Sequence, residues 1–191
     1  MGRLVVAELM SIDGVSEAPG GEPGYRHTNW VGKRHEAKQI EHKFKEVLDH
    51  EALLLGRVTY ESFAGGWPTY KGPFADRMNS MLKYVVSSVL KNPTWNNTTV
   101  LHGEPMTAVG RLKQSLEGDI LVEGSRTLAN ALRRHGFVDE YRLMVFPVIL
   151  GSGAQFFDRT EDATNLRLTA THSFANGAVE LTYQVLRGEE I

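Results

Sequence analysis

The sequence of 191 residues contains no cysteine, and that absence excludes several kinds of chemistry. Disulfide bridges, thiolate zinc sites, cysteine nucleophiles and iron–sulfur clusters all require the thiol group. No metal site is expected from the seven histidines, because no two of them have the i, i+4 spacing of a helical metal pair. A reducing environment agrees with this composition, so we expect a cytoplasmic protein with no bound metal.

The chain also lacks an excess of either charge and any long apolar run. The 21 basic and 23 acidic residues leave a net charge of -2, which provides no electrostatic attraction to nucleic acid or to an anionic membrane. No stretch approaches the roughly 18 consecutive apolar residues that a membrane span needs. The first residues lack the long apolar core of a signal peptide. We therefore expect neither nucleic acid nor a membrane among the partners.

Short apolar runs alternate with helical patterns along most of the chain. The spacing predicts strands at residues 3–10, 52–56, 83–88, 98–101, 119–123, 139–149, 165–174 and 178–187. Helices are predicted at 34–49, 58–64, 74–81 and 106–116, and between Ser125 and Gly136. The last two strands meet across Asn176-Gly177, which is a strong hairpin signal. This order predicts one α/β domain over residues 1–191, with a mainly parallel central sheet flanked by helices and a C-terminal antiparallel hairpin.

Several glycine- and hydroxyl-containing turns follow directly after the predicted strands. They are Ser11–Gly14, Gly56–Thr59, Ser87-Ser88 and Glu123–Thr127. In mainly parallel sheets a ligand lies beyond the carboxyl ends of the strands, so one ligand can contact several of these turns. The loop from Ser11 to Lys33 is longer than an ordinary structural connection, which indicates a functional or a mobile segment.

The turn Gly56-Arg57-Val58-Thr59 combines the features of an anion-binding helix start. Backbone N–H groups at a helix N-terminus point outward and the helix dipole favours an anion there. Arg57 and Thr59 would add a positive charge and a hydroxyl donor. The same residues are equally consistent with a tight turn, an ordinary helix cap and a surface arginine.

The turn Glu123-Gly124-Ser125-Arg126-Thr127 repeats this order of apolar strand, glycine, hydroxyl and helix. It is not the GxGxxG fingerprint of dinucleotide-binding folds. Two such turns, together with Ser87 and Ser88, suit an elongated ligand with several phosphates better than a single anion. For the serine pair alone, simple termination of the strand is the preferred interpretation.

Five motifs in the same order resemble the dihydrofolate-reductase-like superfamily. They are Met10–Gly14, Leu54–Ser62, Val85–Ser88, Ile120–Ser125 and Phe146–Gly153. The first of these is similar to the Ser-Leu-Asp-Gly turn in the C-terminal reductase domain of the bacterial bifunctional riboflavin-biosynthesis deaminase-reductase. The resemblance extends over about residues 3–186 and identifies the chain as a stand-alone form of that domain.

This resemblance implies a dihydrofolate-reductase-like fold and an NADPH-dependent reductase. Hydride would pass to a small heterocycle, the phosphoribosylamino-uracil of riboflavin biosynthesis. The residues implied in cofactor binding are Gly14, Gly56, Arg57, Val58, Thr59, Ser87, Ser88, Glu123, Gly124, Ser125, Arg126 and Thr127. The resemblance also implies a homodimer, for which the apolar segment Leu143–Phe146 is either an interface or part of the core.

The expected substrate residues are Ala7, Leu9, Asp13, Ile40, Phe44 and Trp67. Ile40 occupies the register of the carboxylate that supports proton transfer in dihydrofolate reductase, and an isoleucine cannot exchange a proton. Asp13 is our first candidate for a catalytic acid, although aspartate before glycine also stabilises turns.

Two alternative functions therefore stay open. One is reduction of dihydrofolate or another pteridine with a relocated proton donor, for which Glu36 or Glu41 is available. The other is a regulatory protein that binds NADPH without turnover.

Overall fold

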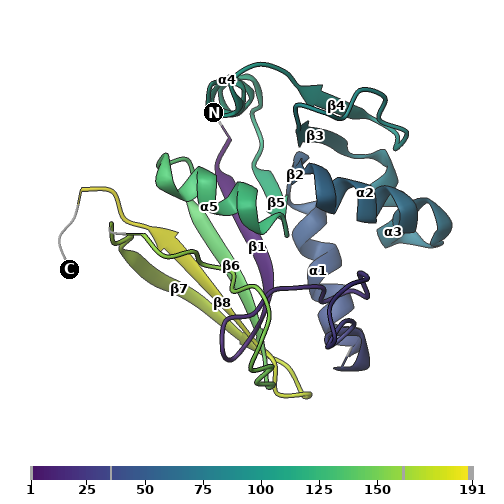
Figure 1. Ribbon diagram of the computed structural model, residues 1–191, viewed down its shortest axis with the longest axis vertical. Coiled ribbons are helices and arrows are strands. Elements are labelled where there is room, and N and C mark those ends of the chain that lie inside the picture. Colours follow the sequence, from purple (N-terminus) through teal and green to yellow (C-terminus); the bar gives the residue numbers. More distant parts are fainter. Residues whose placement is uncertain (1, 35, 161, 189–191) are drawn as a thin grey trace. The chain divides into compact units, whose positions relative to one another are not determined.

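The computed structural model of the protein describes residues 2–34, 36–160 and 162–188, and Figure 1 labels their helices and strands. The strands are β1 (Leu4–Ser11), β2 (Ala52–Gly56), β3 (Leu82–Val86), β4 (Thr98–Leu101), β5 (Ile120–Glu123), β6 (Glu140–Phe146), β7 (Leu166–Ser173) and β8 (Val179–Val185). The helices are α1 (Ala37–Leu48), α2 (Arg57–Gly66), α3 (Pro73–Ser80), α4 (Pro105–Ser115) and α5 (Arg126–Arg134), with short 3-10 helices η1 (Gly32–Arg34) and η2 (Trp67–Thr69).

The strands form one sheet in the order β4-β3-β2-β5-β1-β6-β8-β7. Strand β2 pairs in parallel with both β3 and β5, and β3 pairs in parallel with β4. Strand β8 pairs antiparallel with β6 and with β7. The prediction of a mainly parallel α/β sheet with a C-terminal antiparallel hairpin is confirmed.

The contacts within the chain define two compact units. The first contains the chain up to Val6 and residues His42–Val138, and the second contains Ala7–Glu41 and the chain from Asp139 onward. The division falls inside β1 and inside α1. The expectation of a single domain over residues 1–191 stays a prediction.

The core of the first unit is built on the continuous apolar runs of β2 and β5. Residues Ala52–Leu55 of β2 and Ile120–Val122 of β5 are completely buried. Continuous apolar runs are typical of parallel strands that are covered on both faces. The carboxyl ends of these two neighbouring strands therefore lie on a rigid base.

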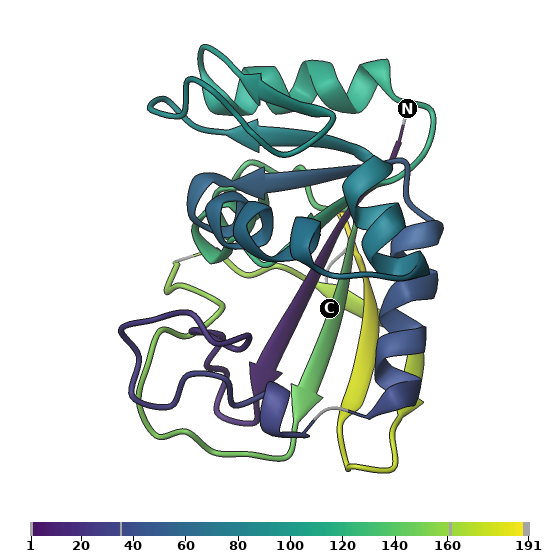
Figure 2. The ribbon, with the colours of Figure 1, turned by 90° about the vertical axis from the view of Figure 1, so that its right-hand side faces the viewer.

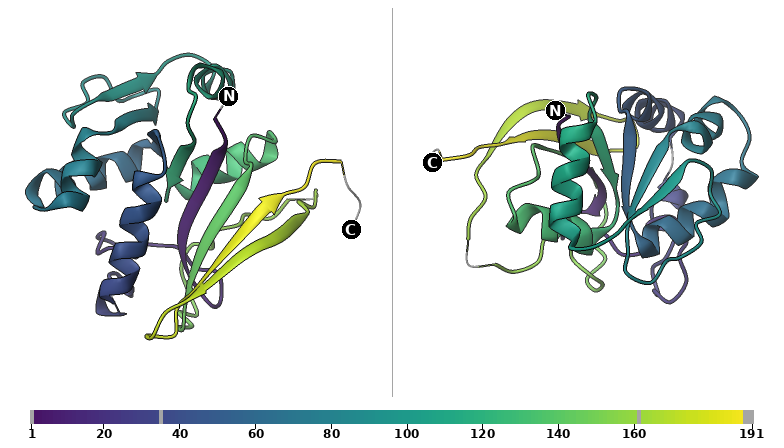
Figure 3. Two further views of the ribbon diagram at one scale, coloured as in Figure 1. Left: turned by 180° about the vertical axis from the view of Figure 1, so that it is seen from behind. Right: turned by 90° about the horizontal axis from the view of Figure 1, so that it is seen from above.

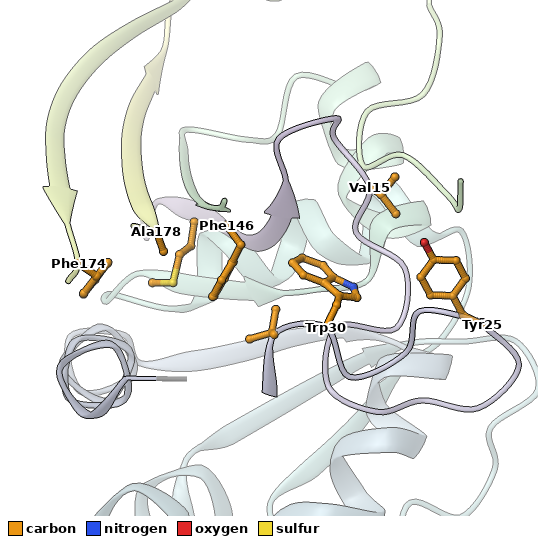
Figure 4. Close-up of a cluster of buried hydrophobic side chains, with 8 residues drawn as sticks. Val15, Tyr25, Trp30, Phe146, Phe174 and Ala178 are labelled. Carbon is orange, nitrogen blue, oxygen red and sulfur yellow. The ribbon is translucent and has the colours of Figure 1, made fainter. Parts of the chain in front are cut away.

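The core of the second unit gathers around Trp30, which comes from the long loop after β1 (Figure 4). Its ring contacts Phe146 edge to face, with 5.7 Å between ring centroids, and its Nε1–H donates to the Glu17 carbonyl at 2.9 Å. The Tyr25 hydroxyl donates to the Ser152 carbonyl at 2.5 Å. Figure 2 shows this loop, in purple, beside the green segment that contains Ser152. The loop is thus anchored in a core, which argues against a mobile segment, and the functional interpretation of its length stays a prediction.

Several predicted boundaries were wrong by a few residues, two of them for identifiable local reasons. The strand expected at 139–149 ends at Phe146, because Pro147 has no N–H to donate and the Val148 N–H turns back to the Phe146 carbonyl. The helix expected at 58–64 continues through Gly65 and Gly66 before η2 begins. Glycine is unfavourable inside a helix by only about 1 kcal/mol, which packing can offset.

The structure also shows the surroundings of the apolar segment Leu143–Phe146 and of the C-terminal hairpin. Leu143, Met144 and Phe146 are buried in the monomer, so they belong to the core and are not available for the expected homodimer interface. The hairpin of β7 and β8, in yellow tones in Figure 3, turns at Asn176-Gly177 as predicted, with Gly177 at a φ of 85°. Among the described residues, no helix combines the length and apolar character that crossing a membrane requires.

We predict that Trp30→Ala lowers the free energy of unfolding by about 3–5 kcal/mol, the usual cost of removing a buried tryptophan. Trp30 is only 2% exposed and links the long loop to Phe146. Urea denaturation measures the change. Leu168→Ala on β7, where the side chain is 49% exposed, is the control and is expected to cost about 0.5 kcal/mol or less. Equal losses in the two variants would contradict an anchored loop.

Candidate functional site

One hydrogen bond joins the two glycine turns of the first unit. The register pairs Leu54 of β2 with Val122 of β5, so Gly56 and Gly124 lie at equivalent places beyond that pair. The Gly56 N–H donates to the Ser125 Oγ at 2.8 Å. The structure thus brings the Gly56–Thr59 turn and the Glu123–Thr127 turn together.

The second of these turns has an uncommon backbone. Gly124 has a φ of 54°, and Ser125 follows with φ 59° and ψ 47°, so two consecutive residues are left-handed. Glycine adopts this conformation readily, whereas serine pays a steric penalty. This conformation places the Ser125 hydroxyl where it accepts a hydrogen bond from the Gly56 N–H.

The helices that begin at these turns start without a side-chain cap. Among the described residues, no side chain accepts a hydrogen bond from the first N–H groups of α2 or of α5. Helix α4 is different, because the Glu104 carboxylate accepts from the N–H groups of Met106 and Thr107. The first four N–H groups of a helix require a partner, which is a side chain, water or a ligand. Two helix starts at adjacent strand ends can therefore donate to an anion.

The side chains of the first turn remain accessible. Arg57 donates through Nη1 to both carboxylate oxygens of Glu61, at 2.9 and 2.7 Å. This pair is about half exposed, so it contributes little to stability and can exchange for another anion. Val58 is 68% exposed, and Thr59 is half-buried beside Gly124.

The two serines after β3 have different surroundings. The Ser87 Oγ accepts from the N–H groups of Val89 and Leu90, at 3.2 and 3.0 Å. These bonds stabilise the turn that ends the strand, in agreement with strand termination. Ser88 is exposed and Arg126 and Thr127 are exposed at the start of α5.

Glu123, the residue before Gly124, is in contact with a lysine that the sequence analysis did not select. The Lys43 Nζ donates to the Glu123 carboxylate at 2.8 Å and also contacts the Glu46 carboxylate. Lys43 precedes Glu46 by three residues, a helical ion-pair spacing that is visible in the sequence. Its contact with Glu123, eighty residues further along, is not.

In the second unit, Asp13 holds the turn at the end of β1. Its carboxylate accepts from the Ser11 hydroxyl at 2.6 Å and from the N–H groups of Leu150 and Gly151, at 3.1 and 2.8 Å. The hydrogen bond from Ser11 and those from the two backbone groups lower the pKa of Asp13 to about 2. Gly14 completes the turn at a φ of 80°.

These contacts favour a role for Asp13 in holding the turn over a role in donating a proton. A carboxyl group with a pKa near 2 carries no proton at neutral pH. The same three hydrogen bonds occupy both carboxylate oxygens. The catalytic role of Asp13 stays a prediction that this conformation does not support.

The expected substrate residues fall in different environments. Ala7 is completely buried, main chain included, and Leu9 packs against the core around Trp30. Ile40 and Phe44 lie one helical turn apart on α1, and Ile40 is 45% exposed. Phe44 and Trp67 are brought together by Phe74.

Phe74 was missed in the sequence, yet its ring centroid lies 5.4 Å from that of Phe44 and 4.9 Å from that of Trp67. All three side chains are half-buried. The sequence analysis selected Phe44 and Trp67, and no pattern in the sequence singled out the ring between them. The three rings, which come from α1, η2 and α3, form one cluster in which neighbouring rings are tilted by 32° and 46°.

The profile of the RibD C-terminal domain family matches residues 3–179. The chain belongs to this family. The predicted resemblance to the reductase domain of the riboflavin-biosynthesis enzyme is thereby confirmed. The uncharacterized protein YwjB of Bacillus subtilis is 30% identical over 181 residues, which cover 94% of this chain and 90% of that protein.

Solved structures of RibD-type proteins share the fold. A putative riboflavin biosynthesis protein from Shewanella sp. PV-4 has a TM-score of 0.77 at 16% identity, with 97% of this chain and 99% of that chain covered. A diaminohydroxyphosphoribosylaminopyrimidine deaminase/5-amino-6-(5-phosphoribosylamino)uracil reductase from Thermotoga maritima has a TM-score of 0.68 at 11% identity. The match covers 97% of this chain and 57% of the T. maritima chain.

For this RibD-family domain we predict that Ser125→Ala lowers the free energy of unfolding by about 1–2 kcal/mol, because the Gly56 N–H loses its acceptor. Urea denaturation of both proteins gives the difference. Ser115→Ala at the end of α4 is the matched control, since the exposed Ser115 hydroxyl only donates to the Leu112 carbonyl. Similar stabilities of the two variants would show that the bond between the turns contributes nothing.

A second prediction concerns the stability of the folded protein at low pH. The pKa of Asp13 is lower in the folded protein than in the unfolded chain, so the unfolded chain binds the proton first as pH falls. Asp13 therefore adds stability above about pH 4 and loses that contribution between about pH 4 and pH 2. Asp13→Asn should be less stable than the wild type at about pH 7, and the gap should narrow towards about pH 2. A gap that stays constant across urea titrations in this range would contradict the assignment.

Proposed function

We propose that this protein is an NADPH-dependent reductase that transfers a hydride to a small heterocycle, of the type that riboflavin biosynthesis uses. The observation that carries the proposal is the pair of helix starts, α2 and α5, which the Ser125 hydroxyl joins and no described side chain caps. Membership in the RibD C-terminal domain family supports a reductase. The name of the T. maritima protein, a uracil reductase, supports a pyrimidine-like substrate.

The residues at the two turns fit a ligand with several phosphates. Gly56 and Gly124 leave the backbone open to close approach, and the first N–H groups of α2 and α5 supply donors. Arg57 and the exposed Ser88 are the residues that we assign to the 2′-phosphate or the pyrophosphate, since a guanidinium offers several charge-assisted donors. When bound, the cofactor supplies the hydride.

The role of the chain beyond cofactor binding is to orient a flat ring and to limit water. The rings of Phe44, Trp67 and Phe74 offer an apolar surface for a heterocycle. Hydride addition to a C=N or C=O carbon must be matched by one proton on the adjacent nitrogen or oxygen. Because Asp13 is ionised and Ile40 cannot exchange a proton, we assign the proton to water or to another acid. Ordinary folate reduction is disfavoured for the same reason.

We expect NADPH to raise the melting temperature and NADH to raise it less at equal concentration. A ligand that binds only the folded state stabilises it by about 2.7 kcal/mol at a hundred times its Kd. Arg57→Ala should weaken NADPH binding about ten-fold or more, because charge-assisted hydrogen bonds are lost. Arg111→Ala, which removes the same charge from an exposed site on α4, should leave the Kd nearly unchanged.

Turnover then separates the reductase from its alternatives. Loss of the dihydronicotinamide absorbance is followed with the riboflavin-pathway pyrimidine and with dihydrofolate. Oxidation with the pyrimidine supports the proposal, and oxidation only with dihydrofolate would replace it by pteridine reduction. Tight NADPH binding without oxidation across a panel of pyrimidines and pteridines would indicate a regulatory protein. Absence of NADPH binding would overturn all three functions.

A further inference from the structure

A lysine on α1 lies between two carboxylates in the first unit. The Lys43 Nζ is 2.8 Å from the Glu123 carboxylate and also contacts that of Glu46. The three side chains are 18%, 15% and 2% exposed, respectively. Such a group of three charges is poorly hydrated, and burying charges costs free energy that mutual attraction only partly returns. An ion network of this kind is therefore weak evidence for a purely stabilising role.

The charge of Lys43 is permanent under ordinary conditions. Burial by itself would lower the pKa of the ammonium group, but the charges and hydrogen bonds of Glu123 and Glu46 outweigh burial and raise the pKa above its usual value. Lys43 thus acts as a fixed countercharge. It is not suited to release a proton.

The positive charge of Lys43 matters because Glu123 lies next to the turn into α5. Glu123 is the last residue of β5 and directly precedes Gly124 and Ser125, which form the turn into α5. That turn carries N–H groups suited to an anion, whereas a carboxylate one residue away repels an anion. Because the Glu123 side chain is 15% exposed, dissolved salt screens this repulsion in part.

We propose that Lys43 is a positioning residue for cofactor binding, which compensates the charge of Glu123 so that the Glu123–Ser125 turn accepts a phosphate group. The inference rests on the proposed function. It assigns to a side chain of α1 an effect on ligand affinity that is transmitted through Glu123. The ion pair with Lys43 also restricts rotation of the Glu123 carboxylate, because Lys43 itself is held by its contact with Glu46.

The test compares Lys43→Met, Glu123→Gln, the double variant and Lys43→Arg. Calorimetry gives the Kd of each full-length protein for NADPH, and for inorganic pyrophosphate as a probe that lacks the nicotinamide. Lys43→Met should weaken both ligands, NADPH by about ten-fold or more, which corresponds to about 1.4 kcal/mol. The double variant should recover most of that loss, because the carboxylate whose charge Lys43 offsets is gone. Lys43→Arg should bind nearly as well as the wild type.

Two further measurements separate this role from a structural one. Lys71→Met removes an exposed lysine of the first unit and should leave both Kd values unchanged. The loss in Lys43→Met should shrink as salt rises if it arises from charge, and stay constant if the turn has merely been distorted. Glu123→Gln keeps the shape of the side chain and an acceptor for Lys43, so it should bind NADPH at least as tightly as the wild type.

Each outcome either supports or overturns the role proposed for Lys43. Unchanged affinity in Lys43→Met, or a double variant no better than Lys43→Met, overturns the inference while the proposed function stands. If Lys43→Met does not fold, Glu123→Gln decides: binding about ten-fold weaker than the wild type overturns the inference, and equal or tighter binding supports it. A wild-type protein that binds neither NADPH nor pyrophosphate overturns the proposed function together with the inference.

Discussion

The hydrogen bond from the Gly56 N–H to the Ser125 hydroxyl is the contact on which the candidate cofactor site depends. Parallel pairing of β2 and β5 brings two strand ends to one edge of the sheet, but pairing alone does not fix how the turns beyond them are oriented. The bond does so, and it requires Ser125 to adopt a left-handed conformation. A position that accepts steric strain to place one hydroxyl is typical of a functional turn. The helix starts of α2 and α5 are therefore directed by a single side chain.

The charged side chains around these two turns also affect the binding of an anion. The donors are main-chain N–H groups, which carry only partial charges. The full charges of neighbouring side chains therefore determine how strongly an anion binds. Arg57 supplies a positive charge in the first turn, and its exposed partner Glu61 holds it only weakly. The second turn contains the exposed guanidinium of Arg126 and the carboxylate of Glu123, and Lys43 lies against that carboxylate. Each turn thus combines main-chain donors with a positively charged side chain.

Most of the architecture could be predicted because it depends on local patterns. The apolar runs of β2 and β5, each followed by glycine and a helix, are sufficient to predict the parallel sheet and its turns, and Asn176-Gly177 is sufficient for the hairpin. What could not be predicted depends on contacts between distant residues. The donors to Asp13 are the backbone groups of Leu150 and Gly151, which have no sequence signature. The order of the long loop depends on Tyr25 reaching Ser152, and the role of Lys43 on its meeting Glu123.

This contrast explains why the cofactor of this RibD-family domain is easier to propose than its substrate. A phosphate-binding turn made of main-chain N–H groups needs only glycines, small hydroxyls and a helix that follows, and many sequences meet those conditions. Substrate chemistry requires particular side chains, since protons move between titratable groups and rings are selected by the surfaces they contact. Here an isoleucine stands in the register of an acid, the Asp13 carboxylate is hydrogen-bonded within its turn, and three aromatic rings meet at Phe74. A fold of this kind can therefore keep its phosphate-binding turns while the side chains that select a substrate change.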